Sequence, residues 1–172
     1  MRNSLKKMML ASLALLPAVA GAAYTVGGPF PGTVTTTTYY SDGSYHGAVD
    51  LSSSAACGYW GVETGIGASL SWDVTIRTTG KVCYGSGSGN QNEVKHTTAT
   101  GYTFRQWHFL KTADSYDRTC NRCLIGDEGG TGSATGPHTH MMLDKAGSNS
   151  TSWYLSTLNG KFLNRGDKIG TI

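Results

Sequence analysis

Two short stretches of the sequence place histidines and a carboxylate where they could share one site. TGPHTH contains His138 and His140, and residues two apart on a β-strand point to the same side. HGAVDL contains His46 and Asp50, and its glycine and valine favour an extended chain in which these two also share a face. Two or three histidines with one carboxylate are typical ligands of catalytic zinc, which keeps one position open for water.

Each pattern alone is more often a pair of surface side chains than a pair of metal ligands. Their joint occurrence, with a glycine-rich segment before the second pattern, favours the metal site. We expect those glycines to allow tight turns and close backbone approach.

The N-terminus and the composition indicate an exported all-β protein. Basic residues, about a dozen apolar residues and then small residues form the pattern of a secretory signal. We therefore expect residues 1–23 to be a signal peptide and residues 24–172 to be one domain. The apolar run is too short for a membrane span of about 20 residues. Twenty-four glycines and many threonines and serines predict a small antiparallel β-sheet or sandwich with long loops lining a cleft.

The charge of the chain argues against nucleic acid as a partner. The formal net charge is +3, but Arg2, Lys6 and Lys7 all lie in the predicted signal. Removing these three from fourteen bases leaves eleven, which equals the number of acids. A nearly neutral domain lacks the basic surface that binds phosphates.

Four cysteines in an exported chain predict disulfides. We favour Cys57 with Cys83 and Cys120 with Cys123 among the three possible connectivities. The alternative is that Cys120 and Cys123 form half of a zinc knuckle, but such a site needs a second close pair of cysteines.

The same alternation separates apolar residues from the site residues. It places Val49 and Leu51 on one face of the strand in HGAVDL, and Met141 and Leu143 on one face of the strand that follows TGP. In both strands the histidines and the carboxylate then lie on the opposite face.

Four blocks in order resemble the lysostaphin-type (LytM-like) zinc peptidases, the peptidoglycan endopeptidases that include staphylolysin and the β-lytic proteases. The blocks are HGAVDL, VTIRTTGKV, QWHFL and IGDEGGTGSATGPHTH, and they reach from His46 to His140. Three positions depart from the family pattern. Thr139 stands where an apolar residue is usual, Gly47 comes one position early, and Gln106 stands where tyrosine is usual.

The resemblance implies a role for each residue of the site. His46, Asp50 and His140 would bind one zinc ion, and His138 and His108 would lie beside its open position. The glutamate of the H-E-x-x-H metalloproteases is absent, so histidines must move the protons. We expect His138 to be the general base and His108 its partner or a stabiliser of the oxyanion, although their order stays open.

Three other residues are weighed against ordinary structural roles. Tyr40 and Tyr45 come shortly before the first ligand and could place a phenol over the substrate, although packing is the commoner role for such residues. His96 matches a family histidine that does not bind metal, and we expect it to be structural.

The resemblance therefore predicts an exported zinc metalloendopeptidase, periplasmic or secreted and monomeric, that cleaves peptide bonds in bacterial peptidoglycan. The bond would belong to a glycine-containing cross-bridge or a D-alanyl cross-link. One alternative is a non-catalytic member that binds the wall or activates an amidase. Another is a metal-free extracellular β-module stabilised by disulfides.

Overall fold

The computed structural model describes residues 23–68, 70–111, 119–150 and 156–172. The predicted signal peptide therefore lies outside the described residues, apart from its last position. Within the described part, no helix is long and apolar enough to cross a membrane.

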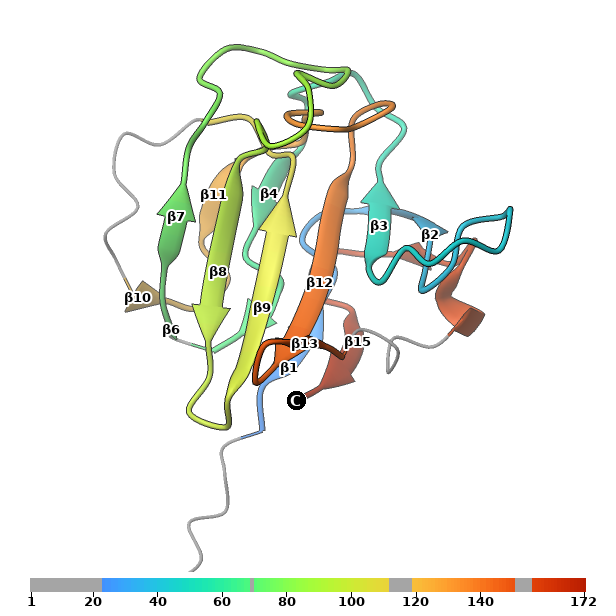
Figure 1. The fold of residues 1–172 in the computed structure, drawn as a ribbon. Helices are drawn as coiled ribbons and strands as arrows, with labels where there is room; N and C mark the ends of the chain where they lie inside the picture. Colours follow the sequence, from blue (N-terminus) through green and yellow to red (C-terminus); the bar gives the residue numbers. More distant parts are fainter. Residues whose placement is uncertain (1–22, 69, 112–118, 151–155) are drawn as a thin grey trace, which may run out of the picture.

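An eight-stranded antiparallel sheet is the main element of the fold (Figure 1). Its order is β14-β2-β3-β12-β9-β8-β7, and β13 pairs with β12. The strands are β2 (Gly32–Thr36), β3 (Val49–Ser52), β7 (Asp73–Thr75), β8 (Glu93–Thr97), β9 (Tyr102–Trp107), β12 (Thr139–Lys145), β13 (Ser148–Asn149) and β14 (Phe162–Leu163).

Smaller antiparallel sheets accompany the main one. They comprise β1 (Thr25–Gly27) with β5 (Ile66–Gly67) and β15 (Lys168–Thr171), β4 (Gly61–Glu63) with β11 (Leu124–Asp127), and β6 (Leu70–Ser71) with β10 (Thr119–Cys120). The pair β4 and β11 lies behind the main sheet in Figure 1. A 3-10 turn spans Ser156–Leu158. The buried amide of Gln106 joins the layers, because it accepts from the N–H of Gly65 and donates to the carbonyl of Glu63. The all-β, antiparallel prediction is confirmed.

The core lies on the face of the main sheet to which the alternation assigns the apolar residues. Val49, Leu51, Met141 and Leu143 are fully buried there. The predicted start of the first strand is wrong, however, because β3 begins at Val49. The N–H groups of His46 and Gly47, just before this strand, both donate to the carbonyl of Thr38, and Gly47 has a φ of +70°. His46 is therefore placed by a turn.

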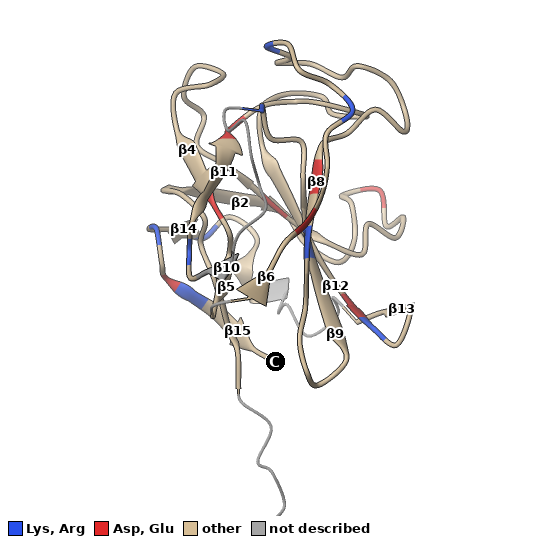
Figure 2. Cartoon of the chain, turned by 90° about the vertical axis from the view of Figure 1, so that its left-hand side faces the viewer, with Lys and Arg blue, Asp and Glu red and all other residues tan. Residues whose placement is uncertain are grey.

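The opposite face of the sheet carries paired charges. Arg105 bridges Glu93 and Asp144 at 2.6 and 2.7 Å, and Lys95 lies 2.6 Å from Asp73. Figure 2 shows basic and acidic positions side by side on these strands. This face carries mainly polar and charged side chains, together with Trp107 and Met142, and the histidines lie at one end of it.

The disulfide between Cys57 and Cys83 is confirmed. Cys123 is also disulfide-bonded, whereas the side chain of Cys120, its expected partner, lies outside the described residues. The zinc-knuckle alternative is wrong, since the sulfur of Cys123 is already bonded.

Candidate metal centre

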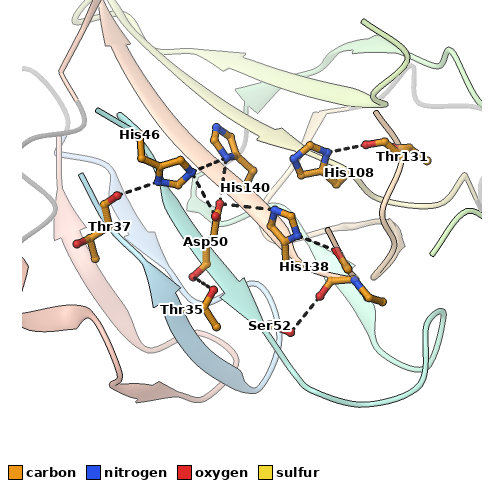
Figure 3. Close-up of polar contacts among 11 residues, drawn as sticks. Thr35, Thr37, His46, Asp50, Ser52, His108, Thr131, His138 and His140 are labelled. Atoms are coloured by element: carbon orange, nitrogen blue, oxygen red, sulfur yellow. Dashed lines mark hydrogen bonds and ion pairs between the residues drawn. The ribbon is translucent and has the colours of Figure 1, made fainter. Parts of the chain in front are cut away.

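Sheet register brings the central ligands together. His140 on β12 lies opposite Asp50 on β3, and on its other side it lies opposite Trp107 on β9. Residues paired across antiparallel strands project from the same face. The carboxylate and the imidazole therefore meet on the polar face of the sheet, and His46 reaches them from the turn before β3 (Figure 3).

The three predicted ligands converge at distances that suit a zinc ion. Nε2 of His46 is 3.2 Å from Nδ1 of His140 and 3.2 Å from a carboxylate oxygen of Asp50. Nδ1 of His140 is 3.0 Å from the other oxygen of Asp50. Ligand atoms around a tetrahedral zinc ion, with bonds of about 2.0–2.1 Å, lie roughly 3.3 Å apart. Little movement would thus be needed to bind the metal.

A hydrogen bond to a backbone carbonyl fixes the tautomer of His46. Its Nδ1 lies 2.8 Å from the carbonyl oxygen of Thr37, to which it donates. With the proton on Nδ1, the lone pair of Nε2 is available and faces the other two ligands.

His138 and His108 lie beside this group. Nε2 of His138 is 3.7 Å from Asp50, and the rings of His138 and His108 are 4.6 Å apart. Nδ1 of His138 donates to Gly136 at 2.9 Å, and Nδ1 of His108 donates to Thr131 at 2.6 Å. Both rings therefore keep an Nε2 lone pair. His108, His138 and His140 form a second group of nitrogens within 4.8 Å, which shares His140 with the first.

An unusual backbone conformation turns His108 toward the site. It has a φ of +76°, a region that non-glycine residues rarely adopt. Consecutive residues of a strand face opposite sides, but this kink at the end of β9 leaves both Trp107 and His108 lining the same groove. The carbonyl of His108 accepts from Thr131, and its N–H donates to Asn92.

The glycine-rich segment forms the wall that supports His138. The backbone N–H of His138 donates to the carbonyl of Gly129. A Cβ on Gly130 would lie 2.6 Å from the carbonyl oxygen of Cys83, and Gly132 has a φ of +83° against the backbone of Gln91. The expectation of tight turns and close backbone approach is met at these positions.

Glu128 belongs to the same wall and was missed by the sequence analysis. It is fully buried, and its carboxylate accepts from the N–H and the hydroxyl of Ser53. Burial raises the pKa of Glu128 despite these bonds. The neighbouring Ser52 donates to the carbonyl of Pro137 at 3.0 Å, so the end of β3 is tied to the segment just before His138. Only the position of an acid inside the glycine run hints at this role.

Burial and mutual charge set the protonation of the site. Burial would raise the pKa of Asp50, but hydrogen bonds from His140 and His46 outweigh it and hold that pKa well below its usual range. Burial lowers the pKa of His140, whereas Asp50 more than offsets burial at His46 and raises its pKa. Burial and the nearby His138 lower the pKa of His108 to about 3. Asp50 is thus ionised and His108 neutral at neutral pH.

The two tyrosines take different positions. The ring of Tyr40 lies 4.5 Å from the ring of His46 and lines the groove. Burial, then Asp50 and Asp42, raise its pKa, so the phenol stays protonated. Tyr45 is outside the groove lining, and its hydroxyl donates to Asn149 at 2.8 Å.

His96 lies apart from the site. It is fully buried, Nε2 contacts the hydroxyl of Thr64 at 2.8 Å, and Nδ1 contacts the carbonyl of Ser71 at 3.1 Å. Burial lowers its pKa to about 4. Both nitrogens are used inside the protein, as a structural histidine requires.

The site opens into a groove of about 900 Å³. Asp50 and the histidines are the only ionisable groups among its described lining residues, apart from the phenol of Tyr40. Small residues such as Ser88, Gly89 and Ala134 also line it. The groove therefore suits an extended, uncharged ligand.

Comparison with known proteins identifies the fold. No family model and no curated protein matches the sequence. Among solved structures, a protein of Pseudomonas aeruginosa assigned to peptidase M23 has a TM-score of 0.50 and 17% identity, over 79% of this chain and 50% of that one. The catalytic domain of the prophage-encoded M23 protein EnpA from Enterococcus faecalis has a TM-score of 0.46 and 21% identity, over 78% and 89%. A zinc-containing peptidase from Vibrio cholerae has a TM-score of 0.44 and 16% identity, over 72% and 38%.

The chain has the fold of the M23 peptidases, the LytM-like zinc peptidases that the motifs resemble. It spans half the length of the Pseudomonas protein. The closer likeness to staphylolysin and the β-lytic proteases stays a prediction.

Proposed function

We propose that this protein is an exported zinc metalloendopeptidase of the LytM-like family that hydrolyses peptide bonds in bacterial peptidoglycan. The observation that carries the proposal is the convergence of His46, Asp50 and His140 within 3.2 Å, with His138 and His108 beside them. Zinc at this position would polarise the carbonyl of the scissile bond and lower the pKa of water.

His138 is the side chain best placed to move protons. Its Nδ1–H is committed to Gly136, so Nε2 acts as the acceptor at the open side of the site. After Nε2 takes the proton of the attacking water, the imidazolium can deliver it to the leaving amine. One residue then serves both proton transfers.

His108 suits the role of partner better than that of oxyanion stabiliser. It is neutral at pH 7, and its Nδ1–H donates to Thr131. Its Nε2 is therefore an acceptor, which can orient a protonated His138 but cannot donate to an oxyanion. The phenol of Tyr40 is the donor we propose for the oxyanion.

The groove agrees with the proposed substrate class. A wall peptide segment rich in glycine or alanine is small and uncharged near its cross-link, and the lining of the groove offers small side chains and no Lys or Arg among the described residues. The disulfide between Cys57 and Cys83 supports an oxidising, extracytoplasmic location.

The test is digestion of purified peptidoglycan by the purified protein, with mass analysis of the new termini. We expect new amino termini that vanish with a zinc chelator, return with added zinc, and are absent with His138→Ala. The identity of the termini distinguishes a glycine cross-bridge from a D-alanyl link.

Two other outcomes would contradict the proposal. Binding of one zinc ion and of peptidoglycan without new termini would identify a non-catalytic wall-binding protein. Absence of stoichiometric zinc by elemental analysis would identify a metal-free module.

A further inference from the structure

The geometry points to Trp107 as a positioning residue that strengthens metal binding by holding the ring of His140. This inference rests on the proposed function only in requiring that His140 binds a metal ion. It assigns to the groove an aromatic side chain that is neither a ligand nor a proton carrier.

The two rings lie in parallel contact. Their centroids are 4.7 Å apart and their planes differ by 8°. The contact arises from sheet register, because Trp107 on β9 and His140 on β12 are direct cross-strand partners. The backbone of both strands therefore fixes the stack.

Stacking orients the imidazole for its ligand role. A flat indole against one face of the ring opposes rotation about χ2, the torsion that would turn Nδ1 away. That nitrogen is the one that lies 3.0 Å from Asp50 and 3.2 Å from His46. A ligand already aimed at its partners loses less conformational freedom on binding.

The indole should also stabilise the metal-bound state through an electrostatic interaction with the imidazole of His140. Metal binding withdraws electrons from an imidazole and makes the ring cationic, and the face of an indole attracts positive charge more strongly than the faces of other aromatic side chains. The neutral ring of the metal-free site gains less from the same contact. The stack therefore stabilises the metal-bound site more than the metal-free site, and this difference in free energy increases the affinity for the metal.

A second observation makes Trp107 unusual at its position. Its indole Nε1 is buried and has no hydrogen-bond partner among the described residues. An unpaired buried N–H destabilises a fold, and phenylalanine or leucine at this strand position would avoid that cost. The stack on His140 provides a reason for tryptophan here.

The chain contains a matched control. Trp72 contacts His96 with ring centroids 5.8 Å apart and planes at 88°. This pair also joins an indole to a buried histidine, but it meets edge to face and lies outside the metal site. Loss of Trp72 should affect folding alone.

The experiment measures zinc affinity by competition with a chromogenic chelator for the purified wild-type protein, Trp107→Leu, Trp107→Phe and Trp72→Leu. We expect about tenfold weaker binding for Trp107→Leu, at the lower end of the range for residues that orient metal ligands. Trp107→Phe keeps a flat ring and should lose less than Trp107→Leu. Trp72→Leu should bind zinc like the wild type, even if its melting temperature falls.

Fluorescence provides a readout independent of affinity. Zinc binding should change the emission of Trp107, because its stacking partner becomes cationic, and this change should be absent in Trp107→Phe. The fluorescence comparison remains decisive if Trp107→Leu does not fold.

Failure of this inference can be distinguished from failure of the proposed function. If the wild type binds zinc and Trp107→Leu binds it equally well, or if the zinc-induced emission change persists in Trp107→Phe, the inference is wrong while the proposed function stands. If the wild type binds no zinc, the proposed function itself fails.

Discussion

Two regions of the molecule hold buried or half-buried histidines in opposite ways. His96 uses both ring nitrogens internally, on Thr64 and Ser71. At the candidate metal centre, His46, His108 and His138 each give only Nδ1 to a backbone carbonyl, which leaves Nε2 directed at the other groups of the site. Burial alone therefore does not identify a reactive histidine. What distinguishes the two regions is whether one nitrogen remains available.

The largest effects should come from removing ligands. His140→Ala or Asp50→Ala should abolish stoichiometric zinc binding and lower kcat/KM by about a thousandfold or more, because the metal provides most of the charge stabilisation. Elemental analysis and peptidoglycan assays measure the two effects. The matched variant is His96→Gln, which should keep zinc and activity. A His96→Gln protein without zinc would contradict the structural role of His96.

Within the candidate metal centre, we expect His138 to be needed for catalysis but not for zinc binding. His138→Ala should keep one zinc ion and lower kcat by about 10²–10⁴-fold, the usual contribution of a general acid or base. Metal content and kcat measured on the same sample provide the check. Loss of zinc in His138→Ala with retention in His140→Ala would exchange the two roles.

The structural role of His96 should also appear in the free energy of unfolding at acid pH. The pKa of His96 is about 4 in the folded state, below the unfolded value of about 6.5. Its contribution to stability is therefore full above pH 6.5 and is lost as pH falls from 6.5 to 4. The loss should reach about 3 kcal/mol at pH 4.

Urea unfolding in the presence of chelator, at a series of pH values, measures this loss. His96→Gln should show a decline between pH 6.5 and 4 that is smaller by that amount, since every other titrating group is shared. Equal declines in the two proteins would show that His96 protonates within the fold.

The smallest expected effect is a difference in kcat between variants of the two tyrosines, which differ in whether the hydroxyl already has a partner. The hydroxyl of Tyr45 is bound to Asn149, whereas that of Tyr40 has no partner among the described residues and lines the groove. Tyr40→Phe should lower kcat by at least about tenfold if its phenol donates to the oxyanion, and Tyr45→Phe should change it less than twofold. Equal kcat values for the two variants would remove Tyr40 from the mechanism.

Local patterns in the sequence predicted much of the site. The spacing of His138 and His140, and of His46 and Asp50, identified the residues that the structure brings together. Alternation correctly placed Met141 and Leu143 on the face opposite to the histidines, where both are buried. Each of these features lies within one strand or one turn, so the spacing of residues along the chain is enough to predict it.

The remaining features depend on which strands pair and in what register. The stack of Trp107 on His140 exists because β9 and β12 place these residues opposite one another. The inward turn of His108 depends on a positive φ at a residue that normally avoids it. Burial of Glu128 depends on the end of β3 packing against the glycine-rich segment. None of these contacts is encoded by spacing along the chain.

The position of β12 in the sheet has a consequence for how the protein assembles. β12 follows β9 in the chain by more than thirty residues, yet it lies between β3 and β9. Until it is inserted, the β14-β2-β3 and β9-β8-β7 halves have no hydrogen-bonded connection in this sheet. The strand that joins them also brings His140. The pairing of β12 with β3 that closes the sheet is therefore the same pairing that sets His140 beside Asp50.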